Sequence, residues 1–194
     1  MRTKSLLTIG LAAAGMMYGA SVFAAGSTPT TGPFGTGKIT FTGTITNSPC
    51  DIAPGDDAIA VQLGQISYRH LKNIDDASDS KPFTIHLQNC AFDPDDATSN
   101  PNPVGKMSKV TVSFSGNADL GNKGYVNTGN AQNVAVQLLK SDNHTILTPN
   151  TDADAQQLQT GNNELNFFAR VVALTTGVTP GTIESSVTYT LKYL

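Results

Sequence analysis

Apolar and polar residues alternate one by one along several short stretches of the chain, including its last ten residues. There, the polar positions hold serine, threonine and lysine, and the apolar positions hold Val187, Tyr189, Leu191 and Tyr193. A period of two, rich in β-branched and aromatic residues, predicts a β-strand with one buried face. The sequence ends on this strand, so we expect one of its edges to lack a partner within the chain.

The same alternation recurs in five further stretches, which are separated by loops rich in glycine, asparagine, aspartate and proline. Their apolar residues are Ile59, Val61 and Leu63; Phe83, Ile85 and Leu87; Val110, Val112 and Phe114; Val134, Val136 and Leu138; and Leu165, Phe167, Ala169 and Val171. Only residues 67–76 suggest a helical turn or two. Many short strands joined by turns predict an all-β sandwich of the immunoglobulin type.

One more alternating stretch lies near the N-terminus, after residues 25–36, which are almost entirely glycine, proline, serine and threonine. Such a composition predicts a mobile arm. Behind it, one face of residues 37–46 carries threonines and a lysine, and the other face carries Gly37, Ile39, Phe41, Gly43 and Ile45. This stretch is either a strand offered to another molecule or the first strand of its own domain.

The first 24 residues have the layout of a secretory signal peptide. Two basic residues, Arg2 and Lys4, precede an apolar run, and Val22 and Ala24 suit the cleavage site. An uncleaved membrane anchor is the alternative, which the short apolar run disfavours. Cleavage leaves 170 of the 194 residues, enough for one domain with a sizeable core. It removes two of the 12 basic residues and none of the 15 acidic ones, so the net charge goes from −3 to −5.

The chain has two cysteines, Cys50 and Cys90. In an exported protein, two cysteines most simply form one disulfide, here closing a loop of about 41 residues. Two free thiols and metal ligation by the pair are the alternatives. Free thiols are disfavoured outside the cytoplasm, and no further cysteine or histidine stands at ligand spacing.

Other groups that resemble functional sites have simpler explanations. Asp93, Asp95 and Asp96 could bind calcium, but they lack the glycine and distal glutamate of an EF-hand loop. The three histidines are scattered, and His86 falls on the polar face of its predicted strand. No nucleophile motif is present, so we expect no enzyme activity, cofactor or metal. An acidic chain without basic clusters also disfavours nucleic acid as a partner.

Several of these features occur together in one known family. They are the signal peptide, the polar arm leading into GKITFTGTITNSPC, the second cysteine closing FTIHLQNC, and the final VTYTLKYL with Gly181 upstream and Tyr193 next to last. In this order they resemble the pilin subunits of chaperone–usher fimbriae of Gram-negative bacteria, in the type 1 and P pilus major-subunit group. Leu194 departs from the family pattern, where a polar final residue is commoner.

The resemblance implies an incomplete immunoglobulin-like sandwich that lacks its last strand. A periplasmic chaperone would first lend a strand, and the arm of the next subunit would later replace it. The donor residues would then be Gly37, Ile39, Phe41, Gly43 and Ile45, with Gly43 entering a narrow pocket. The edge of the acceptor groove would be formed by Val187, Tyr189, Leu191 and Tyr193.

The resemblance also implies a division into a signal peptide (residues 1–24), an arm with the donor strand (25–46) and a pilin domain (47–194). The chain would be a structural subunit, exported through the periplasm, of a fimbria on the outer cell surface that supports adhesion. Its partners would be the chaperone, an outer-membrane usher and identical or related subunits. A minor adaptor or terminator subunit and a tip adhesin of the same fimbria are the alternatives.

Overall fold

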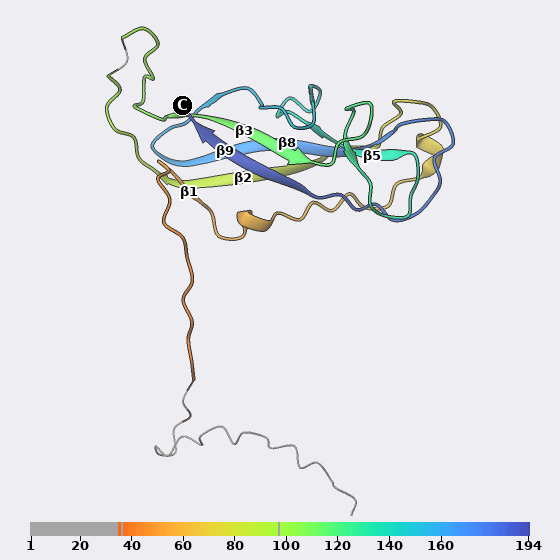
Figure 1. Ribbon diagram of the computed structural model, residues 1–194, viewed down its shortest axis with the longest axis horizontal. Helices are drawn as coiled ribbons and strands as arrows, with labels where there is room; N and C mark the ends of the chain where they lie inside the picture. Colours follow the sequence, from red (N-terminus) through yellow and green to blue (C-terminus); the bar gives the residue numbers. More distant parts are fainter. Residues whose placement is uncertain (1–34, 36, 97) are drawn as a thin grey trace, which may run out of the picture. The chain divides into compact units, whose positions relative to one another are not determined.

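Strands carry almost all the regular structure of the computed structural model, which describes residues 35, 37–96 and 98–194 (Figure 1). The predicted signal peptide and residues 25–34 and 36 of the arm lie outside these described residues. The chain divides into two units, residues 1–45 and 46–194, each of which is taken by itself. In the first, residues 37–45 form neither helix nor strand.

The second unit contains two short 3₁₀-helices and nine strands among its described residues. In chain order these are β1 (Asp51–Ile52), η1 (Asp56–Ala58), η2 (Tyr68–His70), β2 (Lys81–Cys90), β3 (Lys109–Gly116), β4 (Tyr125–Val126), β5 (Val134–Leu139), β6 (Ile146–Leu147), β7 (Gln156–Gln157), β8 (Gly161–Ala173) and β9 (Val187–Tyr193).

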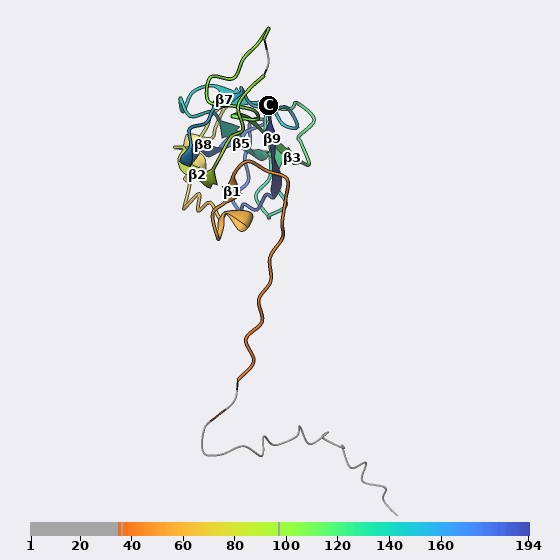
Figure 2. The same ribbon diagram turned by 90° about the vertical axis from the view of Figure 1, so that its left-hand side faces the viewer.

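These strands form two sheets in which every pair is antiparallel. The larger sheet has the order β1-β2-β8-β5-β4, with β6 also beside β5, and the smaller has the order β7-β3-β9. Figure 2 shows β2 and β8 on one side of the unit and β3 and β9 on the other. The prediction of an all-β sandwich is therefore confirmed.

The core lies between the two sheets and is built from the alternating apolar residues. Ile85, Leu87 and Leu165 face it from the larger sheet, while Val110 and Val112 face it from the smaller one. At its centre the rings of Phe114 and Phe167 meet edge to face, with centroids 5.0 Å apart. Such pairs stabilise a core beyond the area they bury, and here they join the two sheets.

Five of the six strands predicted for this unit are confirmed as β2, β3, β5, β8 and β9, and the predicted helical turn is present as η2. The strand expected around Ile59, Val61 and Leu63 is absent. These three side chains are nonetheless half-buried against the core, and their neighbours Ala60 and Gln62 are exposed. The alternation here therefore reflects which side chains are buried. It does not produce a strand, because no backbone hydrogen bond joins residues 59–66 to another described residue.

The expected disulfide joins Cys50, just before β1, to Cys90, the last residue of β2. Both cysteines are buried, and β1 pairs with β2 beside them. The bond therefore ties the start of the second unit to the edge of its larger sheet.

Gly181 lies where the chain approaches β9. A Cβ atom placed there would lie 2.4 Å from the backbone nitrogen of Ala131, far closer than real Cβ contacts. Hydrogen bonds from Thr128 to Glu184 and from Ala131 to Thr182 hold the same two segments together. The glycine that accompanies the family resemblance thus permits a close backbone approach that leads the chain into β9.

Candidate functional site: the free edge of β9

β9 has one paired and one free edge. On one side it pairs with β3 over seven residues, from Val110 opposite Tyr193 to Gly116 opposite Val187. On the other side, no strand of the described chain is hydrogen-bonded to it. A free edge presents a row of N–H and C=O groups that can template pairing with another chain.

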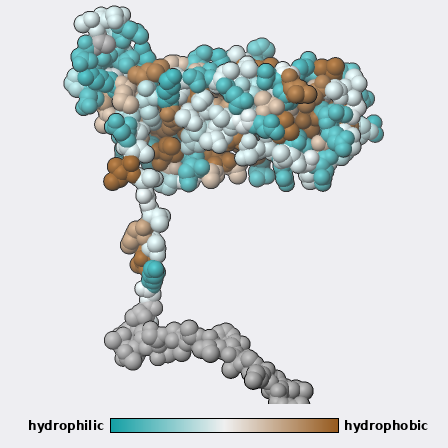
Figure 3. Space-filling model, in the orientation of Figure 1, coloured by the Kyte–Doolittle hydropathy of each residue, from teal (hydrophilic) through white to brown (hydrophobic). Residues whose placement is uncertain are grey.

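The two faces of β9 differ in polarity as predicted. Thr188, Thr190 and Lys192 are exposed. The side chains packed against the core, all half-buried, are Val187, Tyr189, Leu191 and Tyr193. Brown apolar surface lies beside β9 in the view of Figure 3. The structure therefore places the four predicted residues together on one inward face, and their role as a groove edge stays a prediction.

Residues 59–66 run along the same side of the unit as β9 (Figure 1). Near one end of this segment, the hydroxyl of Tyr189 donates a hydrogen bond to the backbone carbonyl of Asp56, with 2.9 Å between the oxygens. Toward the other end, Leu63 and Ile66 pack against the same small cluster of buried residues as Ile183, which precedes β9. Both ends of the segment are thus tied to β9 or to the residues leading into it.

Asp56 connects η1 to both sheets. Its carboxylate accepts a hydrogen bond from the backbone N–H of His86 at 2.5 Å and lies 2.9 Å from the Nδ1 atom of the same residue. Its carbonyl holds Tyr189, as described above. His86 is exposed as expected, but its pairing with Asp56 was not predicted, because 30 residues separate them.

The environment of β9 changes the acidity of its tyrosines. Burial raises the pKa of Tyr189, and the negative charges of Asp56 and Asp57 raise it further. Burial likewise raises the pKa of Tyr193, against the opposing effect of a hydrogen bond with Ser48. Both shifts favour the neutral form of the side chain, which suits an apolar contact surface.

The described part of the arm exposes its apolar row. Relative to full exposure, the side chains of Ile39, Phe41 and Ile45 are 78%, 88% and 102% exposed. A Cβ atom added at Gly37 or Gly43 would meet no atom within 4 Å. The alternative that residues 37–46 form the first strand of their own domain is not supported, because they form no strand.

The acidic residues that the sequence offers for calcium make other contacts within the described ranges. No cluster of three metal-ligating side chains occurs there. In the acidic loop, Asp96 pairs with Lys106 at 3.0 Å, which raises the pKa of that lysine, and Asp95 accepts a hydrogen bond from the backbone of Asn102. None of the described helices is long and apolar enough to cross a membrane.

Comparison with known proteins identifies the family. A family model described as "Fimbrial protein" matches residues 39–194, which is the whole of the second unit together with residues 39–45 of the arm. The chain belongs to the fimbrial protein family. This membership confirms the resemblance to fimbrial subunits that the sequence motifs indicate.

Relatives of this fimbrial protein cover most of its length. It is 31% identical over 191 residues to an uncharacterized fimbrial-like protein, YgiL, of Escherichia coli K12, covering 98% of this chain and 97% of the relative. It is 33% identical over 163 residues to the long polar fimbria protein A of Salmonella typhimurium LT2, covering 82% of this chain and 84% of the relative.

The fold also has solved counterparts. A chain from the structure of a chaperone–usher pilus superposes with a TM-score of 0.68 at 24% identity, covering 84% of this fimbrial protein and 99% of that chain. The likeness establishes the immunoglobulin-like pilin fold for this chain.

Proposed function

We propose that this fimbrial protein is a structural subunit that polymerises by donor-strand exchange into a surface fibre supporting adhesion. The arm of one copy, residues 25–46, would supply the strand that the domain of another copy, residues 47–194, lacks. The observation that carries the proposal is the free edge of β9 above a half-buried apolar face. The exposed alternating row on the arm is the complementary half.

The chemistry of the two halves supports their pairing. An added strand gains affinity from backbone hydrogen bonds and specificity from alternate side chains that fill pockets. Ile39, Phe41 and Ile45 stand at alternate positions and are largely exposed, so most of their apolar surface is available to be buried. Gly43, in the same row, is suited to a constricted position because it has no side chain.

The partly buried apolar residues within residues 59–66 provide a second argument for a donated strand. Ile59, Val61 and Leu63 are partly buried against the same core as the inward face of β9, and no backbone hydrogen bond joins them to another described residue. A strand inserted between this segment and β9 would cover both apolar rows. Every strand pair in the structure is antiparallel, so we infer that the donor runs antiparallel to β9.

An uncovered strand edge of this kind favours aggregation. The subunit would therefore need a partner that covers the edge during export. The subunit would be exported to the periplasm, where a pilus chaperone would cover the edge until an outer-membrane usher brings the next subunit. Its lasting partners would be identical or related subunits, and no enzyme activity or nucleic-acid binding is part of this role.

Electron microscopy of negatively stained cells tests the proposal. We expect fibres on cells that express the gene, none on cells that lack it, and restored fibres when the intact gene is returned. A variant lacking residues 37–45 should be secreted to the periplasm but should restore no fibres. Loss of receptor binding with intact fibres would instead indicate a tip component, and fibres built by the variant without residues 37–45 would overturn the proposal.

A further inference from the structure

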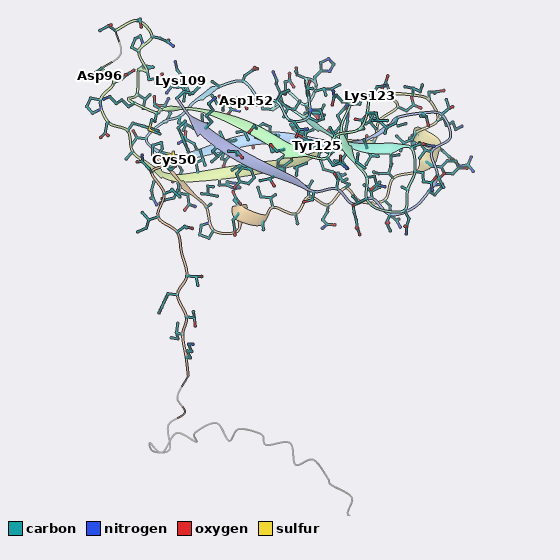
Figure 4. The ribbon with its side chains drawn as sticks, in the orientation of Figure 1. Cys50, Asp96, Lys109, Lys123, Tyr125 and Asp152 are labelled. Carbon is teal, nitrogen blue, oxygen red and sulfur yellow. A yellow bond between two sulfur atoms is a disulfide. The ribbon has the colours of Figure 1, made fainter. Side chains whose placement is uncertain are left out.

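Two loops at one end of the domain hold apolar side chains out in solvent. Leu120 is fully exposed and Ile74 about half exposed. The loops that carry them are joined by an ion pair between Lys123 and Asp75. Figure 4 shows Lys123 at the end of the domain opposite Cys50.

The loop around Leu120 is held firmly in shape. The carboxylate of Asp119, itself buried, accepts hydrogen bonds from the backbone N–H groups of Gly121 at 2.8 Å and Gly124 at 2.7 Å. Backbone hydrogen bonds from Asp119 to Gly124 and from Asn122 to Asp119 close the turn. A rigid loop that presents an apolar side chain needs little ordering when a partner covers it.

This end of the domain is where a donated arm would leave β9. The loop follows Gly116, the last residue of β3, which pairs with Val187, the first residue of β9. A donor antiparallel to β9 begins near Tyr193 with its Gly37 and ends near Val187 with its Ile45. The body of the donating subunit therefore emerges beside the loop that carries Leu120.

The connection between the donor strand and that body is short. Only residues 46–49 separate Ile45 from Cys50, and at most about 3.6 Å per residue limits the span to roughly 18 Å. The span is shortened further because the hydroxyl of Ser48 donates to the carbonyl of Cys50 at 2.7 Å. The disulfide end of the donating subunit must then lie close to this end of the acceptor.

We propose a second contact between successive subunits, in which Leu120 and Ile74 of the acceptor pack against residues 48–54 of the donating copy. That segment contains Ile52, an exposed apolar residue two positions after Cys50. The contact rests on the proposed donor-strand exchange and extends it, because it limits how far one subunit can rotate about the linker to the next.

Site-specific photo-crosslinking in assembled fibres tests the contact. Leu120 is replaced by p-benzoylphenylalanine, the variant is co-assembled with unmodified subunits, and adducts formed on illumination are located by fragmentation mass spectrometry. We expect adducts to residues 48–54 of another copy. The reciprocal probe at Ile52 should label residues 73–76 or 117–124. Ile146 provides the control, since its 46% exposure is close to the 42% of Ile52 and the same probe there should not label residues 48–54.

The outcomes separate this proposal from the one it rests on. Fibres that form but give no adduct from Leu120 to residues 48–54, or the same adduct from Ile146, would overturn the second contact and leave strand exchange intact. Absence of fibres from unmodified subunits would contradict strand exchange itself. If the Leu120 variant does not assemble into fibres, the same probe is placed at Ile74. It should also form adducts to residues 48–54 of another copy, and their absence would overturn the second contact.

Discussion

Replacing Phe41 by alanine should weaken the fibre without weakening the subunit. The Phe41 side chain is 88% exposed in the arm, so nearly all of its surface remains to be buried when the arm is donated. Full burial of a phenylalanine contributes about 1.5–3 kcal/mol, and truncation of a buried one costs about 3–5 kcal/mol when a cavity remains. We therefore expect the Phe41→Ala fibre to lose roughly 3 kcal/mol per junction, about a hundredfold in the dissociation constant.

The assay compares isolated fibres heated in detergent, with dissociation into monomers followed by gel electrophoresis. Phe41→Ala fibres should dissociate at a clearly lower temperature than wild-type fibres. Thr42→Ala is the matched control, since Thr42 is the next residue and points to the opposite side of the strand. The reasoning fails if both variants shift the dissociation temperature equally, or if neither shifts it.

Three further predictions concern single residues. Gly43→Asn should abolish polymerisation while the chaperone complex survives, because overpacking a narrow pocket costs about 1–3 kcal/mol or more; normal fibres would show that the donor register is wrong. Cys90→Ser should sharply lower the periplasmic yield, because the disulfide across 40 residues of sequence contributes about 4 kcal/mol; an undiminished yield would contradict this. Tyr189→Phe should remove a hydrogen bond worth about 0.5–1.5 kcal/mol near neutral pH. It should also lessen the alkaline loss of stability measured by urea unfolding, because a raised tyrosine pKa stabilises the fold below the ordinary pKa near 10 and that stability is lost as pH rises above it. An identical alkaline loss in both proteins would refute the role of Tyr189.

The long strands could be predicted from the sequence because apolar residues recur at alternate positions in each, even in β5, which is largely buried on both faces. Val110 and Val112, for example, alternate with more polar residues, and both are fully buried in β3. Ile59 and Val61 show the limit of the same rule. Their alternation gives half-buried side chains but no strand, because periodicity reports which face is apolar and cannot report whether a hydrogen-bonding partner is present.

Contacts between residues far apart in the sequence could not be predicted. The two-residue strands such as β4 are too short to show a period. Asp56, which holds both His86 and Tyr189, stands in a loop where an aspartate is ordinary. Leu120 is likewise a single apolar residue between polar neighbours, and only the fold places it at the end of β9 where a donated arm would leave.

The missing strand itself can be tested within one chain. Residues 36–46 are moved from the N-terminus to follow Leu194 through a four-residue turn, and residues 25–46 are deleted from their original place. The grafted strand can then fold back antiparallel to β9 and cover Val187 to Tyr193. The rest of the domain is unchanged, so any gain in stability comes from the added strand.

The decisive measurement is the melting temperature of the grafted protein against that of the ungrafted subunit freed of chaperone. Each kcal/mol gained raises the melting temperature of a domain of this size by about 2–4 °C. We predict a soluble monomer that melts roughly 10 °C or more higher and neither polymerises nor takes up chaperone. An unchanged melting temperature would mean that the domain already has its full set of strands, which contradicts donor-strand exchange.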